Sequence, residues 1–249
     1  MNQIFSVDGK TILVTGGTRG IGNAIVRALL AGGASVIVNF VREQKNADAI
    51  LGEFGDKNLT LVRADLTREK GMKTLVAALD GITLDGLIHC AATGIHAPVK
   101  DLSVKHWDWT MNLNVRAFFD LIVRLQHQLS KGASVVALSS EGAVRAAPNY
   151  TLVGASKGAL ESLCRHLAVD MCDKGVRFNI LSPGSVLTDS WKVFDNWEER
   201  IARVESKIPG NELVALEEIA SVALFLCSDA SKGMNGHSLV VDRGERIVF

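Results

Sequence analysis

Short apolar runs alternate with longer amphipathic segments from one end of the chain to the other. The runs are rich in β-branched residues and have the length of buried strands, while the segments between them carry apolar residues at helical spacing. Apolar strands joined by helices form a parallel sheet that is covered on both faces, so the pattern predicts a doubly wound α/β fold of the Rossmann type. Seven strands are expected, at Thr11–Thr15, Ser35–Phe40, Leu59–Arg63, Gly86–Ala91, Ser134–Leu138, Val176–Leu181 and Ser238–Val241.

The segments between the strands differ in character. The first helix has one apolar face and is expected to end at Gly32–Gly33. The segments at about 103–130 and 148–173 are long and amphipathic, which is typical of helices that pair with a second subunit, so a homo-oligomer, a dimer or a tetramer, is expected. The stretch Gly184–Asn211 interrupts the alternation, and its apolar residues fit a lid and an ordinary surface helix equally well. These residues are Trp191, Val193, Phe194 and Trp197.

Composition and charge limit the classes of function. The chain has 249 residues, 47% of them apolar, so a single domain spanning 1–249 is expected. Its 27 basic and 27 acidic side chains give a formal charge of +0, which offers no attraction for nucleic acid or for a membrane surface. The sequence has no recognisable leader or membrane-spanning run, so a cytoplasmic location is expected. Neither the six histidines nor the four cysteines have the spacing of metal ligands, and no metal is expected. The cysteines, Cys90, Cys164, Cys172 and Cys227, are interpreted as reduced core residues.

A glycine-rich turn lies directly between the first predicted strand and the first predicted helix. The glycines of Thr15-Gly16-Gly17-Thr18-Arg19-Gly20-Ile21-Gly22 permit a tight turn and a close approach to a pyrophosphate, and the helix N-terminus offers unpaired N–H groups. A purely structural turn is the alternative. The turn residues predicted to contact a dinucleotide are Gly16, Thr18, Arg19, Gly20, Ile21 and Gly22.

The end of the second predicted strand bears on the choice of cofactor. An acid at this point binds the ribose 2′-hydroxyl of NAD, but here the strand ends Val38-Asn39-Phe40. With Arg19 in the turn and Arg42 beyond the strand, the site favours the 2′-phosphate of NADPH. Arg42 paired with Glu43 on a solvated helix start is the alternative. Asp65-Leu66 after the third strand is a candidate for the adenine, or for a helix cap.

The spacing of the turn, Asp65, Asn114, Ser140, Lys157 and Pro183-Gly184 resembles the short-chain dehydrogenase/reductase family over essentially the whole chain. The resemblance implies that Asn114 supports a water-linked proton path to Lys157. It also implies that Asn179 and the segment after it hold the nicotinamide end, with contacts from Pro183, Gly184, Val186 and Thr188. Where the family has Asn-Asn-Ala-Gly after the fourth strand, this chain has His89-Cys90-Ala91-Ala92, and Cys90 and Ala91 are expected beside the adenine ribose.

The family's usual tyrosine, four residues before the lysine, is replaced here by Val153. The chain has a single tyrosine, Tyr150, seven residues before Lys157. This Tyr-x6-Lys arrangement, in Asn149-Tyr150-Thr151-x-Val153-Gly154-x-Ser156-Lys157, resembles the NADPH-dependent type III enoyl-acyl-carrier-protein reductases. On a continuous helix, Tyr150 and Val153 would both lie on the face of Lys157. Near the C-terminus Arg243 stands where the family commonly has glycine.

The spacing has a chemical interpretation. Reduction of a conjugated double bond places the developing charge three bonds from the carbon that receives hydride, so a donor further from the nicotinamide suits it. Tyr150 is therefore predicted to stabilise the enolate of an enoyl thioester, with Lys157 as the cation on the nicotinamide ribose; with the tyrosine displaced, the role of Ser140 is open. A carbonyl reductase and a non-catalytic NADPH-binding protein are the alternatives. The acyl group is expected on acyl carrier protein or coenzyme A, as in fatty-acid biosynthesis, and an acidic carrier would dock on Arg116, Arg124, Lys131 and Arg203.

Overall fold

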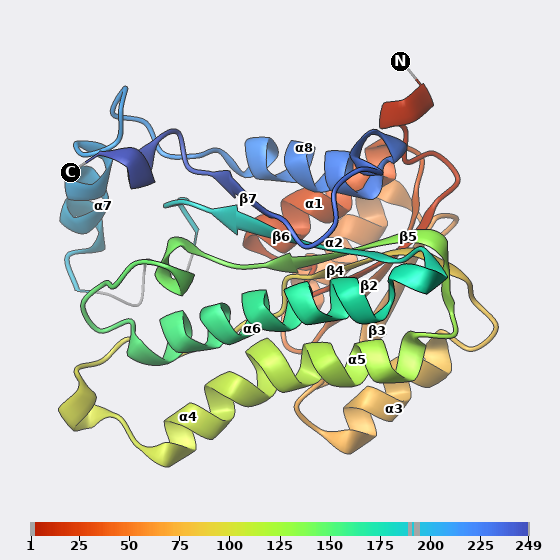
Figure 1. Cartoon of the computed structure of the whole chain (residues 1–249), viewed down its shortest axis with the longest axis horizontal. Helices are drawn as coiled ribbons and strands as arrows, with labels where there is room; N and C mark the ends of the chain where they lie inside the picture. Colours follow the sequence, from red (N-terminus) through yellow and green to blue (C-terminus); the bar gives the residue numbers. More distant parts are fainter. Residues whose placement is uncertain (1–2, 189–190, 192–194, 249) are drawn as a thin grey trace.

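Seven parallel strands form one sheet that is covered by helices on both faces (Figure 1). The computed structural model describes residues 3–188, 191 and 195–248. The strands are β1 (Thr11–Thr15), β2 (Ser35–Phe40), β3 (Leu59–Arg63), β4 (Leu84–His89), β5 (Leu129–Leu138), β6 (Arg177–Pro183) and β7 (Ser238–Val241). Their order is β3-β2-β1-β4-β5-β6-β7, which confirms the doubly wound Rossmann arrangement.

The helices are of very different lengths. They are α1 (Gly20–Ala31), α2 (Gln44–Phe54), α3 (Glu69–Ala78), α4 (Val104–Met111), α5 (Ala117–Leu125), α6 (Thr151–Asp170), α7 (Trp197–Glu205) and α8 (Leu216–Cys227). As predicted, α1 ends at the glycine pair, with Gly32 as its cap and Gly33 in the left-handed region. The segment predicted at 103–130 is not one regular helix, because a π-helical turn, Asn112–Arg116, joins α4 to α5.

Two apolar cores lie on opposite faces of the sheet. One is built around Phe118, Leu121 and Phe178 beneath α3, α5 and α6, and the other around Ile25, Leu29 and the apolar side of α8. Burial of apolar side chains at about 25 cal/mol per Å² is the main stabilising contribution in such cores. The cores leave the carboxyl ends of the strands uncovered, where α7 and the C-terminal tail also lie, at the left of Figure 1.

The predicted bounds of three strands are wrong: β4 and β6 differ at both ends, and β5 differs at its start. Polar residues explain two of these differences. β4 begins at Leu84 because Asp85, which interrupts the apolar run, is satisfied within the sheet by the N–H of Thr11 and the hydroxyl of Ser130. β5 likewise begins at Leu129, through a polar stretch that does not look like a strand. β6 runs two residues further than predicted, with Pro183 still paired to Val241.

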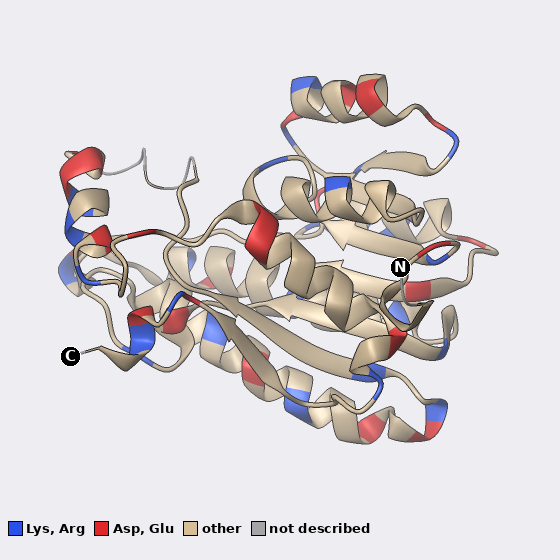
Figure 2. Cartoon of the chain, turned by 90° about the horizontal axis from the view of Figure 1, so that it is seen from above, with Lys and Arg blue, Asp and Glu red and all other residues tan. Residues whose placement is uncertain are grey.

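Other features of the fold bear on the sequence analysis. Cys164 and Cys227 are buried as expected, whereas Cys172 is exposed and Cys90 is half-buried. None of the helices in the described ranges is long and apolar enough to cross a membrane. Of the predicted lid residues, Val193 and Phe194 lie outside the described residues. Acidic and basic residues are interspersed along the chain in Figure 2, in keeping with the net charge of +0.

Candidate active site

The glycine-rich turn after β1 has the conformation that a phosphate-binding turn requires. Gly16 has φ +67°, and a Cβ there would lie 2.8 Å from the Cα of Ala91. Gly22 packs equally closely on the backbone of Gly16, which brings the first turn of α1 onto the loop. Helix α1 has no acidic residue in its first turn, so its N–H groups and partial positive charge are available to an anion.

The predicted turn contacts differ in exposure. Thr18 is 4% exposed and held within the turn, whereas Arg19, which precedes α1, is exposed. A Cβ on Gly20 would point toward Thr188, 3.6 Å from its methyl group. The structure thus brings the glycine turn and the segment after β6 together, and glycine keeps the space between them open. A dinucleotide that crosses from one to the other fits these residues.

The ends of β2 and β3 present cations rather than an acid. Asn39 is 1% exposed, and its amide nitrogen donates to the carbonyl of Ala64 at 2.9 Å, so its side chain joins two strands. Arg42 is exposed just beyond β2. Arg63, which sequence reasoning missed, is exposed at the end of β3 and donates from Nε to the carbonyl of Val41 at 2.9 Å. The pairing of Phe40 with Arg63 in the sheet is what brings this second cation to the site.

Asp65 takes a structural role in a turn before α3, but it is not the helix cap, because the N-cap of α3 is Arg68. Its Oδ1 accepts from the backbone N–H of Thr67 at 3.0 Å and from the Thr67 hydroxyl at 2.6 Å, in a turn before α3. The side chain of Leu66 is buried in the core, so only its backbone faces the site edge. Contacts of either residue with an adenine remain predictions.

The residues that follow β4 pack against the glycine turn. Ala91 donates its N–H to the Thr15 hydroxyl at 3.2 Å, and the same hydroxyl lies 2.9 Å from Nδ1 of the buried His89. Burial lowers the pKa of His89 to about 3, so its ring is neutral. Cys90 lies beside Lys157, and burial raises the pKa of its thiol to about 12. His89 and Cys90 are therefore uncharged, and they lie next to the Lys157 ammonium.

Lys157 is buried in the middle of α6 and faces the sheet. Its Nζ donates to the carbonyl of Leu138 at 2.6 Å, which fixes the ammonium at the end of β5. Burial lowers the pKa of Lys157 to about 8, and the neighbouring Cys90 and Glu161 oppose this shift. Glu161, one turn further along, is itself buried and accepts from the Ser139 hydroxyl at 2.6 Å.

Tyr150 does not lie on the helix of Lys157, as the helical spacing implied, but immediately before it. Pro148 precedes Asn149, which has φ +63°, so α6 begins only at Thr151 with Tyr150 as its cap. The Tyr150 Oη lies 3.3 Å from Oγ of Ser140, the residue that follows β5 by two. Burial raises the pKa of Tyr150, and the hydrogen bond to Ser140 opposes the change. The phenol is therefore protonated and able to donate.

The ring of Tyr150 is held by residues that the sequence analysis did not single out. His96, on the loop after β4, meets the ring edge-to-face with centroids 5.1 Å apart. On its other side Gly142 approaches so closely that a Cβ there would lie within 3.0 Å of the ring carbons. In the sequence, the signal for this contact was Gly142, which stands two residues after Ser140.

Val153, at the family's usual tyrosine position, is part of the packing. It is 7% exposed, and a Cβ on Gly94 would collide with its methyl group. The valine thus fills the space between α6 and the loop after β4. Val153 and Lys157 share one face of α6, as predicted.

Asn114 lies in the π-helical turn and is fully buried. Its Oδ1 accepts from the N–H of Thr93 at 2.8 Å, and its Nδ2 donates to the carbonyl of Thr93 and the hydroxyl of Ser156, both at 2.9 Å. The expected water-linked proton path from Asn114 to Lys157 stays a prediction. Asn114 ties the loop after β4 to α6.

The segment after β6 contains the residues that are predicted to contact the nicotinamide. Pro183 ends the strand, Gly184 follows against Asp242, and Val186 is buried with its backbone bridged to Val214. Thr188 faces the glycine turn, as described above. Asn179, by contrast, is buried within β6, where its side chain bonds to the Met234 carbonyl and the His237 N–H.

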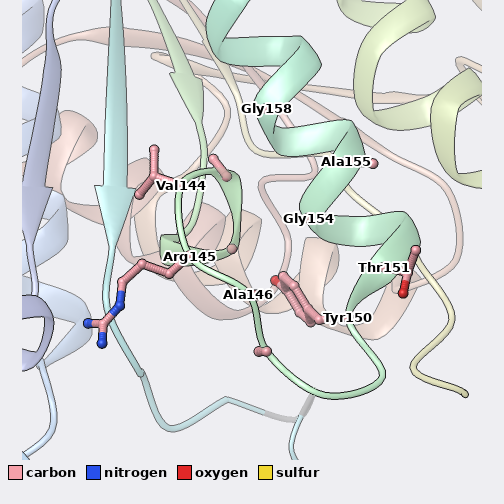
Figure 3. Close-up of a pocket in the computed structure, with 11 residues that line it drawn as sticks. Val144, Arg145, Ala146, Tyr150, Thr151, Gly154, Ala155 and Gly158 are labelled. Carbon is pink, nitrogen blue, oxygen red and sulfur yellow. The ribbon is translucent and has the colours of Figure 1, made fainter. Parts of the chain in front are cut away.

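A cavity of about 380 Å³ opens beside Tyr150 (Figure 3). One wall is the loop from Gly142 to Ala147, and the other is the first two turns of α6. In the close-up the Tyr150 ring lies at the cavity, whereas the side chain of Arg145 extends away from it toward the last strands. The cavity is mostly lined by small residues, and Tyr150 is the predicted catalytic residue among them.

The four cations predicted to receive a carrier do not form one face. Arg124 is paired with Asp120 at 2.7 Å and with Glu69 at 2.9 Å. Lys131 lies near the amino end of β5, opposite the site, whereas Arg203 lies on α7 beside it. The proposed docking face is therefore wrong as a set.

Comparison with known proteins places the chain among reductases and dehydrogenases. Residues 16–245 match the family model described as Enoyl-(Acyl carrier protein) reductase. The chain is 33% identical over 247 residues to 1-cyclohexenylcarbonyl-CoA reductase of Streptomyces collinus, covering 95% of this chain and 86% of that protein. It is 31% identical over 255 residues to the rhamnolipids biosynthesis 3-oxoacyl-[acyl-carrier-protein] reductase of Pseudomonas aeruginosa, covering 98% and 99%.

A solved structure shares both the fold and this level of identity. The Pseudomonas aeruginosa RhlG/NADP active-site complex superposes with a TM-score of 0.90 at 30% identity, covering 98% of this chain and 99% of that chain. The names of the relatives describe reductions of different bonds. The bond that this chain reduces must therefore be inferred from its own site.

Proposed function

This chain is an oxidoreductase of the short-chain dehydrogenase/reductase family, and we propose that it reduces the carbon–carbon double bond of an α,β-unsaturated acyl thioester with NADPH. The observation that carries the proposal is the placement of Tyr150. The chain's single phenol caps α6 beside Ser140, and Val153 fills the position from which the family's usual tyrosine would act. The resemblance to type III enoyl-acyl-carrier-protein reductases supports the same interpretation.

The chemistry requires one hydride, one proton and a stabilised enolate. Bound NADPH would supply the hydride for Cβ of the thioester, and the π electrons of the double bond would move to the carbonyl oxygen. Tyr150 donates a hydrogen bond to that oxygen, and because burial raises its pKa the phenol keeps its proton. Cα then takes a proton that originates from solvent. Placing the donor where charge develops lowers the barrier more than binding the ground state does.

Ser140 and Lys157 have separate roles in the proposed reaction. The Ser140 hydroxyl, 3.3 Å from Oη, orients the phenol in this proposal. Lys157, held on the Leu138 carbonyl, presents its remaining N–H groups to the nicotinamide ribose hydroxyls. Asn114 positions the helix that carries Lys157.

The preference for NADPH rests on charge at the ends of β2 and β3. The neutral side chain of Asn39 cannot repel a phosphate. It is already hydrogen-bonded to the carbonyl of Ala64, the residue that follows β3. Arg42 and Arg63 are exposed on adjacent strand ends, and Arg19 precedes α1. Arginine suits phosphate because its planar fork donates two hydrogen bonds at once.

The acyl carrier and the cellular setting complete the proposal. An acyl group on acyl carrier protein or coenzyme A enters through the cavity beside Tyr150, whose small lining residues admit an alkyl chain. Four free cysteines suit a reducing compartment such as the cytoplasm. The relative from Streptomyces collinus, named for an enoyl thioester, supports the coenzyme A form.

Carbonyl reduction is the second candidate, favoured by the relative named as a 3-oxoacyl-[acyl-carrier-protein] reductase. In that reaction Tyr150 would protonate the oxygen of the carbon that receives hydride. A non-catalytic NADPH-binding role accords less well with a phenol that is hydrogen-bonded to Ser140 and with a lysine that is buried.

The test measures NADPH oxidation with a crotonyl thioester and with the matching β-ketoacyl thioester. We expect turnover of the enoyl thioester, and a loss of roughly 10²–10⁴ in kcat for Tyr150→Phe with the NADPH dissociation constant unchanged. Turnover of only the ketone would assign the chain to the second candidate. Binding of NADPH without turnover of either thioester would contradict both assignments.

A further inference from the structure

Arg243 has a backbone conformation that normally belongs to glycine. Its φ is +50°, in the left-handed region, directly before Gly244 at φ +85°. This conformation is strained for an ordinary L-residue, because the Cβ approaches the following carbonyl oxygen. A side chain at such a position needs compensating contacts, which directs attention to what the guanidinium holds.

The guanidinium of Arg243 binds the end of the long excursion between β6 and α8, defined here as residues 185–212. Its Nε and Nη2 donate to the two carboxylate oxygens of Glu218 at 3.1 and 2.7 Å, in a bidentate pair. Its Nη1 donates to Glu212 at the end of the excursion. Glu218 also accepts from the N–H of Ala215 at 2.8 Å and so caps α8. One arginine therefore fixes the point where the chain re-enters the fold.

Glu245 binds the other end of the same excursion. Its two carboxylate oxygens accept from the backbone N–H of Ser185 at 2.7 Å and from the Ser185 hydroxyl at 2.8 Å. Ser185 directly precedes the predicted nicotinamide contacts Val186 and Thr188. Gly184 permits this contact, because a Cβ there would lie 2.8 Å from the Glu245 carboxylate.

The two anchors lie close together. The ends of the excursion pair through an isolated parallel bridge between Val186 and Val214, both buried. The tail also approaches the interior of the excursion, where a Cβ on Gly244 would lie 3.3 Å from Pro209. Figure 2 shows the mixed acidic and basic colouring of this corner, near the C-terminus.

We propose that Arg243 and Glu245 form a clasp that fixes both ends of residues 185–212 and thereby positions Val186 and Thr188 against the cofactor. They are positioning residues, since neither touches a reacting atom. The effect on substrate turnover rests on the proposed function, but the effects on the excursion and on NADPH binding do not. The clasp predicts a separable effect for each arm, because Glu245 holds the cofactor side and Arg243 the far side.

The test removes each arm and follows three readouts that need no acyl substrate. These are the melting temperature, the NADPH dissociation constant, and the rate of tryptic cleavage within residues 196–207, which include Arg200 and Arg203. The variants are Arg243→Gly and Glu245→Ala. Lys232→Ala is the control, because it removes an exposed ion pair with Asp229 away from the excursion.

Arg243→Gly should speed cleavage several-fold while the melting temperature changes little, because relief of the left-handed backbone offsets the lost ion pairs. Glu245→Ala should raise the NADPH dissociation constant about tenfold, the change that corresponds to roughly 1.4 kcal/mol for a charge-assisted hydrogen bond. Glu245→Gln, which keeps an acceptor for the Ser185 N–H, should recover part of the affinity. With an active substrate, Arg243→Gly should raise KM and leave kcat within about twofold.

The outcomes separate the two proposals. If both variants match Lys232→Ala in cleavage rate and NADPH affinity, the clasp is wrong. If cleavage and affinity respond as expected while the wild type turns over no enoyl thioester, the clasp stands and the proposed function fails.

Discussion

Lys157 combines deep burial with a charge that the cofactor requires. Burial lowers its pKa from 10.5 to about 8, so the ammonium begins to lose its proton just above neutrality. We expect kcat/KM for NADPH to be constant below about pH 8 and to fall by about tenfold per pH unit above it. Steady-state kinetics between pH 6.5 and 9.5 would measure the profile.

The pKa of Lys157 also predicts how stability changes with pH, and this separates a loss of activity from unfolding. Because the unfolded lysine keeps its proton to higher pH than the folded one, the free energy of unfolding contributed by Lys157 rises between pH 8 and 10.5. Loss of activity over this range would therefore accompany a gain in stability from this group. A kcat/KM that stays flat through pH 9.5 would contradict the assignment.

Arg42 and Arg63 offer a second prediction for single residues. If they bind the 2′-phosphate, Arg42→Ala and Arg63→Ala should each weaken NADPH binding by about tenfold and leave NADH binding unchanged, since NADH lacks that phosphate. Fluorescence titration with both dinucleotides measures the difference. Lys57→Ala, an exposed cation at the opposite end of β3, is the matched control. Equal losses for NADH and NADPH would show a role other than phosphate recognition.

At the scale of elements, the loop after β5 must approach α6 closely for Tyr150 to occupy its place. Gly142→Ala would put a methyl group against the Tyr150 ring and displace the phenol. We expect enoyl turnover to fall at least tenfold while NADPH affinity is preserved. Gly52→Ala on α2, where a Cβ meets no atom, should leave activity unchanged and stabilise the helix by about 1 kcal/mol. Full activity in Gly142→Ala would contradict the importance of the contact.

The order and type of the elements could be predicted because apolar runs and helical spacing are local signals. Their ends were less predictable where polar side chains find partners across the sheet, as Asp85 does with Thr11 and Ser130. The residues of the candidate site divide in the same way, into those predictable from local signals and those that depend on contacts across the sheet. The positions of Lys157 and Ser140 could be predicted from spacing, whereas the contribution of Arg63 depends on the pairing of β2 with β3.

Tyr150 shows where a spacing argument fails. Seven residues place two side chains on one face only if the backbone between them is helical throughout, and here the helix begins after Tyr150. The turn signal Pro148-Asn149 was present in the sequence and predicts the break. The phenol therefore comes near Ser140 through a loop conformation, not through helical periodicity.

At the scale of the whole molecule, one face carries exposed apolar side chains on consecutive helices. Trp109 on α4 and Phe119 and Val123 on α5 are 45%, 46% and 47% exposed. Exposed apolar residues grouped in this way are typical of a subunit interface. We expect an oligomer in solution, and a monomer for Phe119→Glu with Val123→Glu, by light scattering after size exclusion. Leu51→Glu on α2 is the control, and a monomeric wild type at micromolar concentration would contradict the prediction.

The bridge between Val186 and Val214 also affects how the sequence between these two residues can evolve. A closed loop whose ends are already joined pays little for extra length, about 0.6 kcal/mol for each doubling. Insertions or exchanges between the two valines should therefore leave the sheet and the lysine undisturbed while reshaping what enters above them. This makes the excursion the natural place for substrate preference to diverge among relatives, and the natural place to graft a new one.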